Sequence, residues 1–144
     1  MKNSELLKLD NQLCFPLYAA TMLVTRLYRP ILQPLGLTYT QYITMMYLWE
    51  NAPCPVSMVA NKLMLNTNTL SPVLKKLEKK GFISRVRSEE DERIVILEML
   101  PEGLKLKNKC ECVPLKLIES IDFSMDDAVK LKKLLLSLIA SSQK

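Results

Sequence analysis

The spacing of apolar residues changes from a helical to a strand pattern after Gly81, and this change restricts the possible folds more than any other feature. Before Gly81, apolar side chains recur every three or four residues, as on one face of an α-helix. Residues 82–87 instead alternate apolar and polar types, and residues 93–99 are rich in β-branched types, which predicts two strands. The polar segment 88–92 joins them, so we expect a β-hairpin.

Local start and stop signals divide the rest of the chain into helices. Pro34 and Gly36 end the first pattern, and Thr38 has Gln41 at the spacing of a capping box. Residues 51–55, with two prolines, are expected to form a loop. Helices are predicted over about residues 9–32, 39–50, 57–63, 67–80 and 101–116, and from 125 onward. The fold class is therefore mainly α with a small β-hairpin (α+β), a winged helix-turn-helix with about six helices.

The composition excludes most enzyme chemistry. The chain has 144 residues, which suits a single domain over 1–144. It has no histidine, so nucleophiles activated by histidine and metal sites that contain it are excluded. Its three glycines are isolated and form no phosphate-binding loop or dinucleotide motif. We therefore expect a protein that is not an enzyme and uses no cofactor and no metal.

The pattern of apolar runs and cysteines indicates a cellular compartment. No apolar run is long enough for a signal peptide or a membrane span, so a cytoplasmic protein without membrane contact is expected. Thiols are normally reduced there, so Cys14, Cys54, Cys110 and Cys112 are expected to be free. The net charge of +5 indicates an anionic partner only weakly.

The terminal helices carry more apolar surface than one small core can bury. In the last helix one stripe contains Leu131, Leu134, Leu135, Leu138 and Ile139. A second copy of the chain is the natural cover, so we predict a homodimer. Residues 1–36 and 101–144 would then form dimerisation helices, and residues 37–100 the DNA-binding winged helix-turn-helix.

The predicted helix over residues 67–80 has the features of a recognition helix. Short polar side chains at a helix N-terminus can approach base edges in the major groove, and lysines follow further along. Considered alone, the segment equally fits a capped helix with a solvated lysine face. The candidate DNA contacts in this helix are Thr67, Asn68, Thr69, Ser71, Lys75 and Lys76.

The hairpin adds basic side chains around an acidic tip. Arg85, Arg87 and Arg93 lie on or next to the predicted strands, while the tip contains four carboxylates. An acidic tip binds phosphate poorly, but a pairing of Asp91 with Arg93 would hold the guanidinium rigidly for entry into a narrow minor groove. The alternative is an ordinary surface salt bridge, which contributes little.

Two segments resemble the MarR family of bacterial regulators: SEEDERIVI at residues 88–96 and NTLSPVLKKLE at residues 68–78. The similarity extends from about Leu9 to Leu138. It implies a homodimer, joined through its terminal helices, that binds double-stranded DNA at the two half-sites of a pseudo-palindromic operator. It further implies that Thr67, Thr69, Ser71 and Pro72 lie against the major groove and that Arg93 enters the minor groove. Asn68 stands where close relatives often have glycine.

The segment NQLCFPLYA at residues 11–19 resembles the OhrR subgroup of organic-hydroperoxide regulators. This resemblance implies that Cys14 senses an oxidant and that tyrosine hydroxyls bind its sulfur. Tyr18 lies one helical turn from Cys14. Tyr28 lies about 21 Å further along the helix, so it would reach only the Cys14 of a partner in an antiparallel dimer. The resemblance assigns this cross-subunit role to Tyr28 and Tyr39.

The expected function is a repressor that releases DNA when an organic hydroperoxide or a related oxidant oxidises Cys14, after which a small thiol or a second cysteine caps the product. Cys110 and Cys112 match the position of a resolving cysteine poorly. Pro16 lacks a backbone N–H and is expected to delay or bend the start of the helix. Three alternatives remain open: a repressor controlled by a small aromatic ligand with a structural Cys14, a thiol peroxidase, and an architectural DNA-binding protein.

Overall fold

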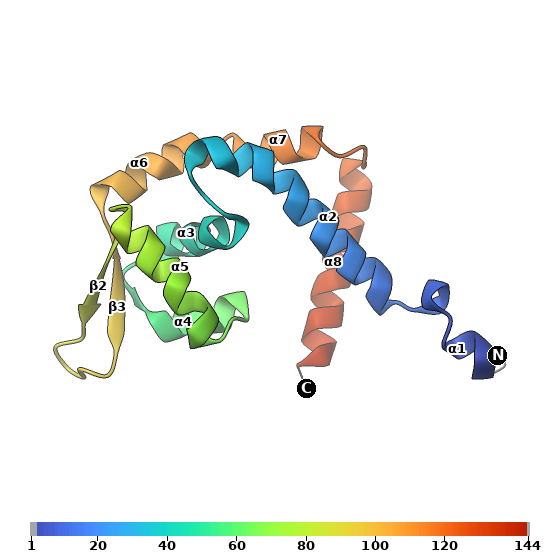
Figure 1. Ribbon diagram of the computed structural model, residues 1–144, viewed down its shortest axis with the longest axis horizontal. Coiled ribbons are helices and arrows are strands. Elements are labelled where there is room, and N and C mark those ends of the chain that lie inside the picture. The colour runs from blue at the N-terminus through green and yellow to red at the C-terminus, as the bar shows by residue number, and fades with distance from the viewer. Residues whose placement is uncertain (1–2, 144) are drawn as a thin grey trace.

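The structure, a computed structural model that describes residues 3–143, has the winged helix-turn-helix architecture predicted from the sequence (Figure 1). The long helices α2 and α8 extend away from the wing formed by β2 and β3, which lies at the opposite end of the molecule (Figure 1). The elements in chain order are α1 (Asn3–Leu6), η1 (Leu9–Asn11), α2 (Cys14–Leu32), η2 (Gln33–Leu35), α3 (Tyr39–Asn51), β1 (Cys54–Pro55), α4 (Val56–Leu63), α5 (Thr67–Lys79), β2 (Ile83–Arg87), β3 (Val95–Met99), α6 (Pro101–Cys110), α7 (Val113–Glu119) and α8 (Met125–Ser142).

The sheet contains a strand that the sequence did not reveal. Its order is β1-β3-β2, with antiparallel pairing throughout, and Arg85 of β2 lies opposite Leu97 of β3. Cys54 pairs with Leu97 from the other side, inside the segment predicted to be a loop. That prediction was wrong because a strand of two residues is too short to show alternation.

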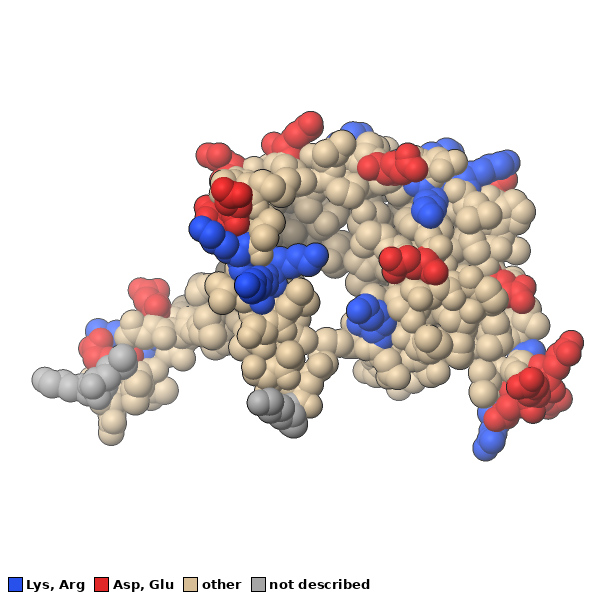
Figure 2. All heavy atoms as spheres, turned by 180° about the vertical axis from the view of Figure 1, so that it is seen from behind, with Lys and Arg blue, Asp and Glu red and all other residues tan. Residues whose placement is uncertain are grey.

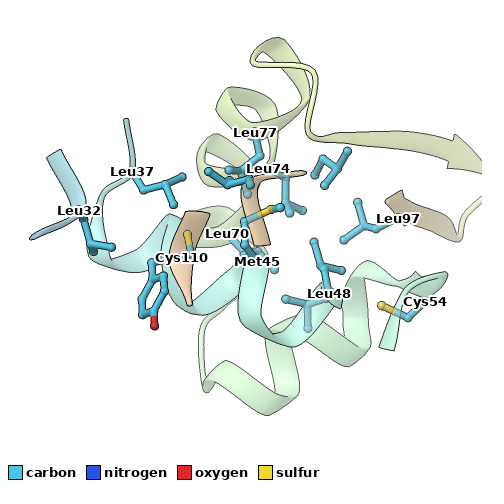
Figure 3. Packing of buried hydrophobic residues seen from close by; sticks show 14 of the residues in the cluster. Leu32, Leu37, Met45, Leu48, Cys54, Leu70, Leu74, Leu77, Leu97 and Cys110 are labelled. Atoms are coloured by element: carbon cyan, nitrogen blue, oxygen red, sulfur yellow. The ribbon is translucent and has the colours of Figure 1, made fainter. Parts of the chain in front are cut away.

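The core joins the helix-turn-helix to the sheet and to the start of the C-terminal helices (Figure 3). Leu70, Leu74 and Leu77 of α5 are fully buried, and their spacing of four and three places them on one face of the helix. The predicted capping box is confirmed, since Thr38 and Gln41 bond each other's backbone N–H at the start of α3.

Two predicted helices differ from the structure. The first regular helix begins at Cys14 rather than Leu9, after the separate 3-10 turn η1. Pro16 is the third residue of α2, where the backbone N–H has no partner within the helix, so its ring is tolerated there. The predicted helix over 101–116 is wrong: α6 ends at Cys110 and α7 begins at Val113. Pro114 explains the break, since a proline is tolerated in a first turn but not in a helix interior.

Many large apolar side chains of the terminal helices are exposed. Leu13 is 69% exposed and Leu134 is also 69% exposed, whereas the core leucines of α5 are at most 1% exposed. Seen from behind, the projecting ends of α2 and α8 show mostly uncharged side chains, while charged residues gather at the wing tip (Figure 2). Within residues 3–143, no helix combines the length and apolar character needed to cross a bilayer.

Candidate DNA-binding surface and thiol site

The recognition helix α5 begins with a side-chain cap. Asn66 Oδ1 accepts a hydrogen bond of 2.7 Å from the backbone N–H of Thr69, which is the arrangement that starts a helix firmly. The opposite end carries basic residues in the last turn, which suits the helix dipole. Ser71 is half-buried, and the other predicted contact residues of the helix are exposed: Thr67, Asn68, Thr69, Pro72, Lys75 and Lys76.

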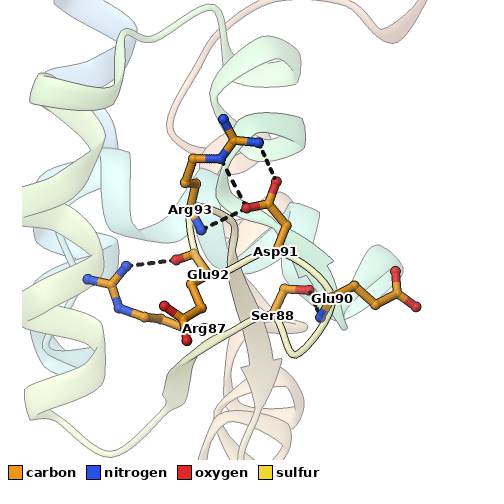
Figure 4. Close-up of polar contacts among 6 residues, drawn as sticks. All are labelled: Arg87, Ser88, Glu90, Asp91, Glu92 and Arg93. Atoms are coloured by element: carbon orange, nitrogen blue, oxygen red, sulfur yellow. Dashed lines mark hydrogen bonds and ion pairs between the residues drawn. The ribbon is translucent and has the colours of Figure 1, made fainter.

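The wing holds Arg93 in a fixed geometry, as the sequence predicted (Figure 4). Asp91 Oδ1 accepts hydrogen bonds from the backbone N–H and the Nε of Arg93, both at 3.1 Å, and Asp91 Oδ2 accepts from Nη2 at 3.0 Å. The Arg93 side chain is nevertheless 90% exposed. A bidentate pair restricts the guanidinium while leaving its other N–H groups free to bind an acceptor.

The wing pair also shifts the acidity of both partners. The hydrogen bonds from Arg93 hold the pKa of Asp91 below its ordinary value, and the carboxylate raises the pKa of the Arg93 guanidinium. Arg87 supports the same tip differently, since its Nη1 donates to the backbone oxygen of Glu92 at 2.8 Å (Figure 4). The Asp91 carboxylate and the Arg93 guanidinium therefore both stay charged at neutral pH.

Arg85 has a different environment from the other two wing arginines. Its Nη2 lies 3.1 Å from Glu78 Oε1 of α5, and its side chain is only 27% exposed. The hydrogen bond from Arg85 lowers the pKa of Glu78. Arg85 Nε is buried and has no partner among the described residues. Arg85 thus ties the wing to the recognition helix, a contact that the sequence did not predict because its two residues lie on different elements.

A groove separates the start of α5 from the wing. It has a volume of about 410 Å³ and is open to solvent. Its lining includes Thr67, Asn68 and Ser71 from α5, together with Arg85 and Arg93 from the wing side. The structure thereby brings the predicted contacts from the helix and from the wing to the two sides of one groove.

Cys14 lies at the first residue of α2, and its side chain is exposed. Tyr18, one turn later, is 65% exposed. Tyr28 lies in the same uninterrupted helix, 14 residues further along, which places it about 21 Å from Cys14 along the axis. The chain therefore does not bring Tyr28 to its own Cys14.

Three tyrosines form a cluster at the other end of α2. The ring of Tyr28 lies 4.9 Å from that of Tyr39 and 5.8 Å from that of Tyr42, measured between centroids. Burial raises the pKa of Tyr28, and burial together with the neighbouring tyrosine raises that of Tyr42 to about 12. Both hydroxyls therefore stay protonated at neutral pH and can donate hydrogen bonds. Tyr42 was not among the predicted site residues, although its spacing of three from Tyr39 puts both on one helix face.

The other cysteines differ in accessibility. Cys54 and Cys110 are buried, and burial raises the pKa of both thiols, to about 11 for Cys110. Cys112 is exposed, in the break between α6 and α7. Within residues 3–143, histidine, cysteine and acidic side chains form no cluster suited to a metal ion.

Known proteins resemble this chain over most of its length. Residues 26–110 match the family model described as transcriptional regulator SarA/Rot. The organic hydroperoxide resistance transcriptional regulator of Bacillus subtilis (strain 168) is 40% identical over 133 residues, which are 92% of this chain and 90% of the relative. Such relatives are transcriptional regulators rather than enzymes.

Solved structures of AbfR, a protein of Staphylococcus epidermidis, share the fold. The reduced form bound to DNA has a TM-score of 0.83 at 29% identity, over 99% of this chain and 97% of that one. The disulfide form has a TM-score of 0.65 at 29% identity, over 98% and 97% of the two chains. The chain belongs to the SarA/Rot family of winged-helix transcription regulators, which share the MarR-type fold.

Proposed function

We propose that this protein is a homodimeric repressor that loses its affinity for DNA when an organic hydroperoxide oxidises Cys14. The observation that carries the proposal is an exposed thiol at the first residue of α2, the helix whose other end contributes Tyr28 to the tyrosine cluster. A relative is named for organic hydroperoxide resistance, and AbfR has both a reduced DNA-bound form and a disulfide form.

The proposed sensing reaction takes place at the sulfur of Cys14. The thiolate attacks one peroxide oxygen, the O–O bond breaks, and the alkoxide leaves as an alcohol after taking up a proton, so that Cys14 becomes a sulfenic acid. A second thiol then attacks this sulfur, which forms a disulfide and releases water. A small thiol or Cys112 suits this second step because Cys112 is exposed, whereas Cys110 is buried and its raised pKa keeps it protonated.

The tyrosines are proposed to hold the reduced sulfur across the dimer. Tyr18 shares the helical face of Cys14, while Tyr28 and Tyr39 would donate hydrogen bonds to the Cys14 of the partner. The 21 Å between Cys14 and Tyr28 excludes a contact within one chain and suits two α2 helices that run antiparallel. A bulkier, oxidised sulfur would break these contacts and shift one subunit against the other.

The dimer is proposed to form through α2 and α8, whose apolar faces are exposed in the single chain. Members of the MarR family are dimers. Two subunits would present two α5 helices to successive major grooves, so the operator would be a near-palindrome. Such a protein would act in the cytoplasm, where its DNA lies and its thiols are reduced.

DNA would be held by the recognition helix and the wing together. Arg93, fixed by Asp91, would enter the minor groove, and Arg87 would contact the neighbouring backbone. Arg85 would face the DNA while its guanidinium stays paired with Glu78, so it would reach less far from the protein surface than Arg93. The proposed contacts of α5 are Thr67, Asn68, Thr69, Ser71, Pro72, Lys75 and Lys76.

The test is a gel-shift assay with the DNA upstream of the protein's own gene. Reduced wild-type protein should bind, cumene hydroperoxide should release it, and dithiothreitol should restore binding. The Cys14→Ser variant should stay bound in peroxide, while the Cys112→Ser variant should still be released when a small thiol is present. Full peroxide release of the Cys14→Ser variant would refute the sensing role, and no binding by the reduced wild type would refute DNA regulation at this site.

A further inference from the structure

One face of α5 points directly away from the core. Successive residues of an α-helix are turned by about 100°, so the side opposite Leu70, Leu74 and Leu77 can be assigned. The residues on this opposite stripe, all exposed, are Asn68, Pro72, Lys75 and Lys79. Asn68 occupies its N-terminal end, at the second residue of the helix.

The carboxamide of Asn68 is available to form hydrogen bonds with a ligand. Asn66, two residues earlier, uses its own side chain to cap the backbone N–H of Thr69. The side chain of Asn68 has no hydrogen-bond partner within residues 3–143. It lines the groove that Arg93 borders from the wing side and Ser57 from α4. A group that both donates and accepts hydrogen bonds thus stands unused where a recognition helix first meets the major groove.

We propose that Asn68 selects an adenine in each half-site of the operator, an inference that rests on the proposed DNA-binding function. The carboxamide oxygen would accept a hydrogen bond from adenine N6, and its NH₂ would donate one to N7, a pair that other bases do not offer in the major groove. The rest of the stripe lacks this capacity. Pro72 has no donor, and Lys75 and Lys79 carry compact charges that suit phosphates.

The test is selection of bound duplexes from a randomised library by the reduced protein, with sequencing of the recovered DNA. The wild type should require A·T at one position of each half-site and should lose affinity about tenfold to a hundredfold when that pair is changed. The Asn68→Ala variant should lose the preference at that position alone. The Asn68→Arg variant should prefer guanine there, because arginine pairs with O6 and N7 of guanine.

A modified base and a matched variant make the test specific. Replacing the selected adenine by 7-deazaadenine removes N7, so it should weaken the wild type but leave the Asn68→Ala variant unchanged. Lys75→Ala, on the same stripe, should weaken binding to all sequences and reduce the salt dependence without changing any base preference. An Asn68→Ala variant with the full wild-type preference would overturn the inference. A wild type that recovers no specific sequence would instead refute the proposed function.

Discussion

Arg93 owes its position to a neighbour two residues away. Three hydrogen bonds that Arg93 donates to the Asp91 carboxylate fix its backbone and guanidinium together, while the Arg93 side chain stays 90% exposed. A pair on the surface adds little to stability, so we propose that its value lies in holding the arginine in one orientation before DNA binds. The pair could be predicted from the sequence because both residues lie at one tip. The Arg85–Glu78 pair could not, because it depends on how the sheet packs against α5.

Removal of the wing arginine should weaken DNA binding without unfolding the protein. We expect the Arg93→Ala variant to lose about 1–3 kcal/mol of binding free energy, measured by fluorescence anisotropy with an operator duplex. Asp91→Ala should cause a smaller loss, because the arginine remains but must be ordered on binding. Glu89→Ala, at the same tip, is the control and should bind at least as well as the wild type. Equal affinity of Arg93→Ala and wild type would discredit the role of the wing.

The Asp91–Arg93 pair should also be visible in a titration. The pKa of Asp91 is lowered in the folded protein, so the pair is complete above the ordinary pKa of an aspartate, about 3.9, and is lost only as the pH falls through the lower folded value. NMR titration of the carboxyl carbon should therefore give a midpoint below 3.9. In the Arg93→Ala variant the midpoint should rise. An unchanged midpoint would mean that the pair does not form in solution.

Close contact between elements depends on a small residue in α6. A Cβ atom added at Gly103 would lie 2.3 Å from the backbone oxygen of Phe82 and 2.4 Å from Met99 Sδ. The carbonyl of Gly103 also accepts a hydrogen bond from Trp49 Nε1 at 2.9 Å, which joins α6 to α3. The start of α6 is thus packed between the sheet and α3, with no room for a side chain at this position.

The Gly103→Ala variant should be clearly less stable than the wild type. A backbone oxygen cannot move aside cheaply, so we expect a loss of about 1–3 kcal/mol in the free energy of unfolding, measured by urea denaturation followed by circular dichroism. Glu102→Ala changes an exposed neighbour and should have little effect. Equal midpoints for Gly103→Ala and the wild type would show that the sheet and α6 are less closely packed in solution.

Elements with a clear period were predictable from the sequence, and short or interrupted ones were not. The capping box of α3, the helix-turn-helix and the two wing strands follow from local residue types. Strand β1 was missed because its pairing with β3 is a long-range contact between two short segments. The break before α7 was missed because the apolar spacing continues across it, although Pro114 marks the place.

Across the whole molecule, the apolar side chains fall into two groups, one buried and one exposed. Leu70, Leu74 and Leu77 of α5 are buried within one chain, whereas most leucines of α8 are exposed, including Leu134 at 69%. The thiol end and the tyrosine end of α2 are also too far apart to meet in one chain. Both observations have one explanation if two chains pack through α2 and α8.

A charge in the proposed interface should separate the subunits. We expect Leu134→Asp to weaken self-association by more than about tenfold, because the interface would have to bury an unpaired carboxylate. Analytical ultracentrifugation should then detect monomer at concentrations where the wild type is a dimer. Lys133→Asp, on the side of the same helix opposite the apolar stripe, tests whether charge on any face of α8 suffices. An unchanged dimer dissociation constant in Leu134→Asp would mean that Leu134 does not lie in the dimer interface.

Mixed dimers should distinguish sensing across the interface from sensing within one chain. One subunit would carry Cys14→Ser, and the other would carry Tyr28→Phe with Tyr39→Phe. The one intact Cys14 then lies in the subunit that lacks both tyrosine hydroxyls. It can contact intact tyrosines only across the interface, from the partner subunit. We expect the mixed dimer to release DNA in peroxide at a rate near that of a dimer with one Cys14→Ser substitution alone. A rate equal to that of the double tyrosine variant would contradict the cross-subunit site.

The most direct measurement of the central claim follows one sample of the DNA-bound protein while cumene hydroperoxide is added in steps below one equivalent. Mass spectrometry of the peptide that contains Cys14, after the free thiols are alkylated and the protein is digested, gives the fraction of Cys14 that has been oxidised, and anisotropy of the labelled duplex gives the fraction of DNA released. The two fractions should rise together, and both should return to zero with dithiothreitol. Complete oxidation of Cys14 with the duplex still bound at unchanged affinity would contradict the account.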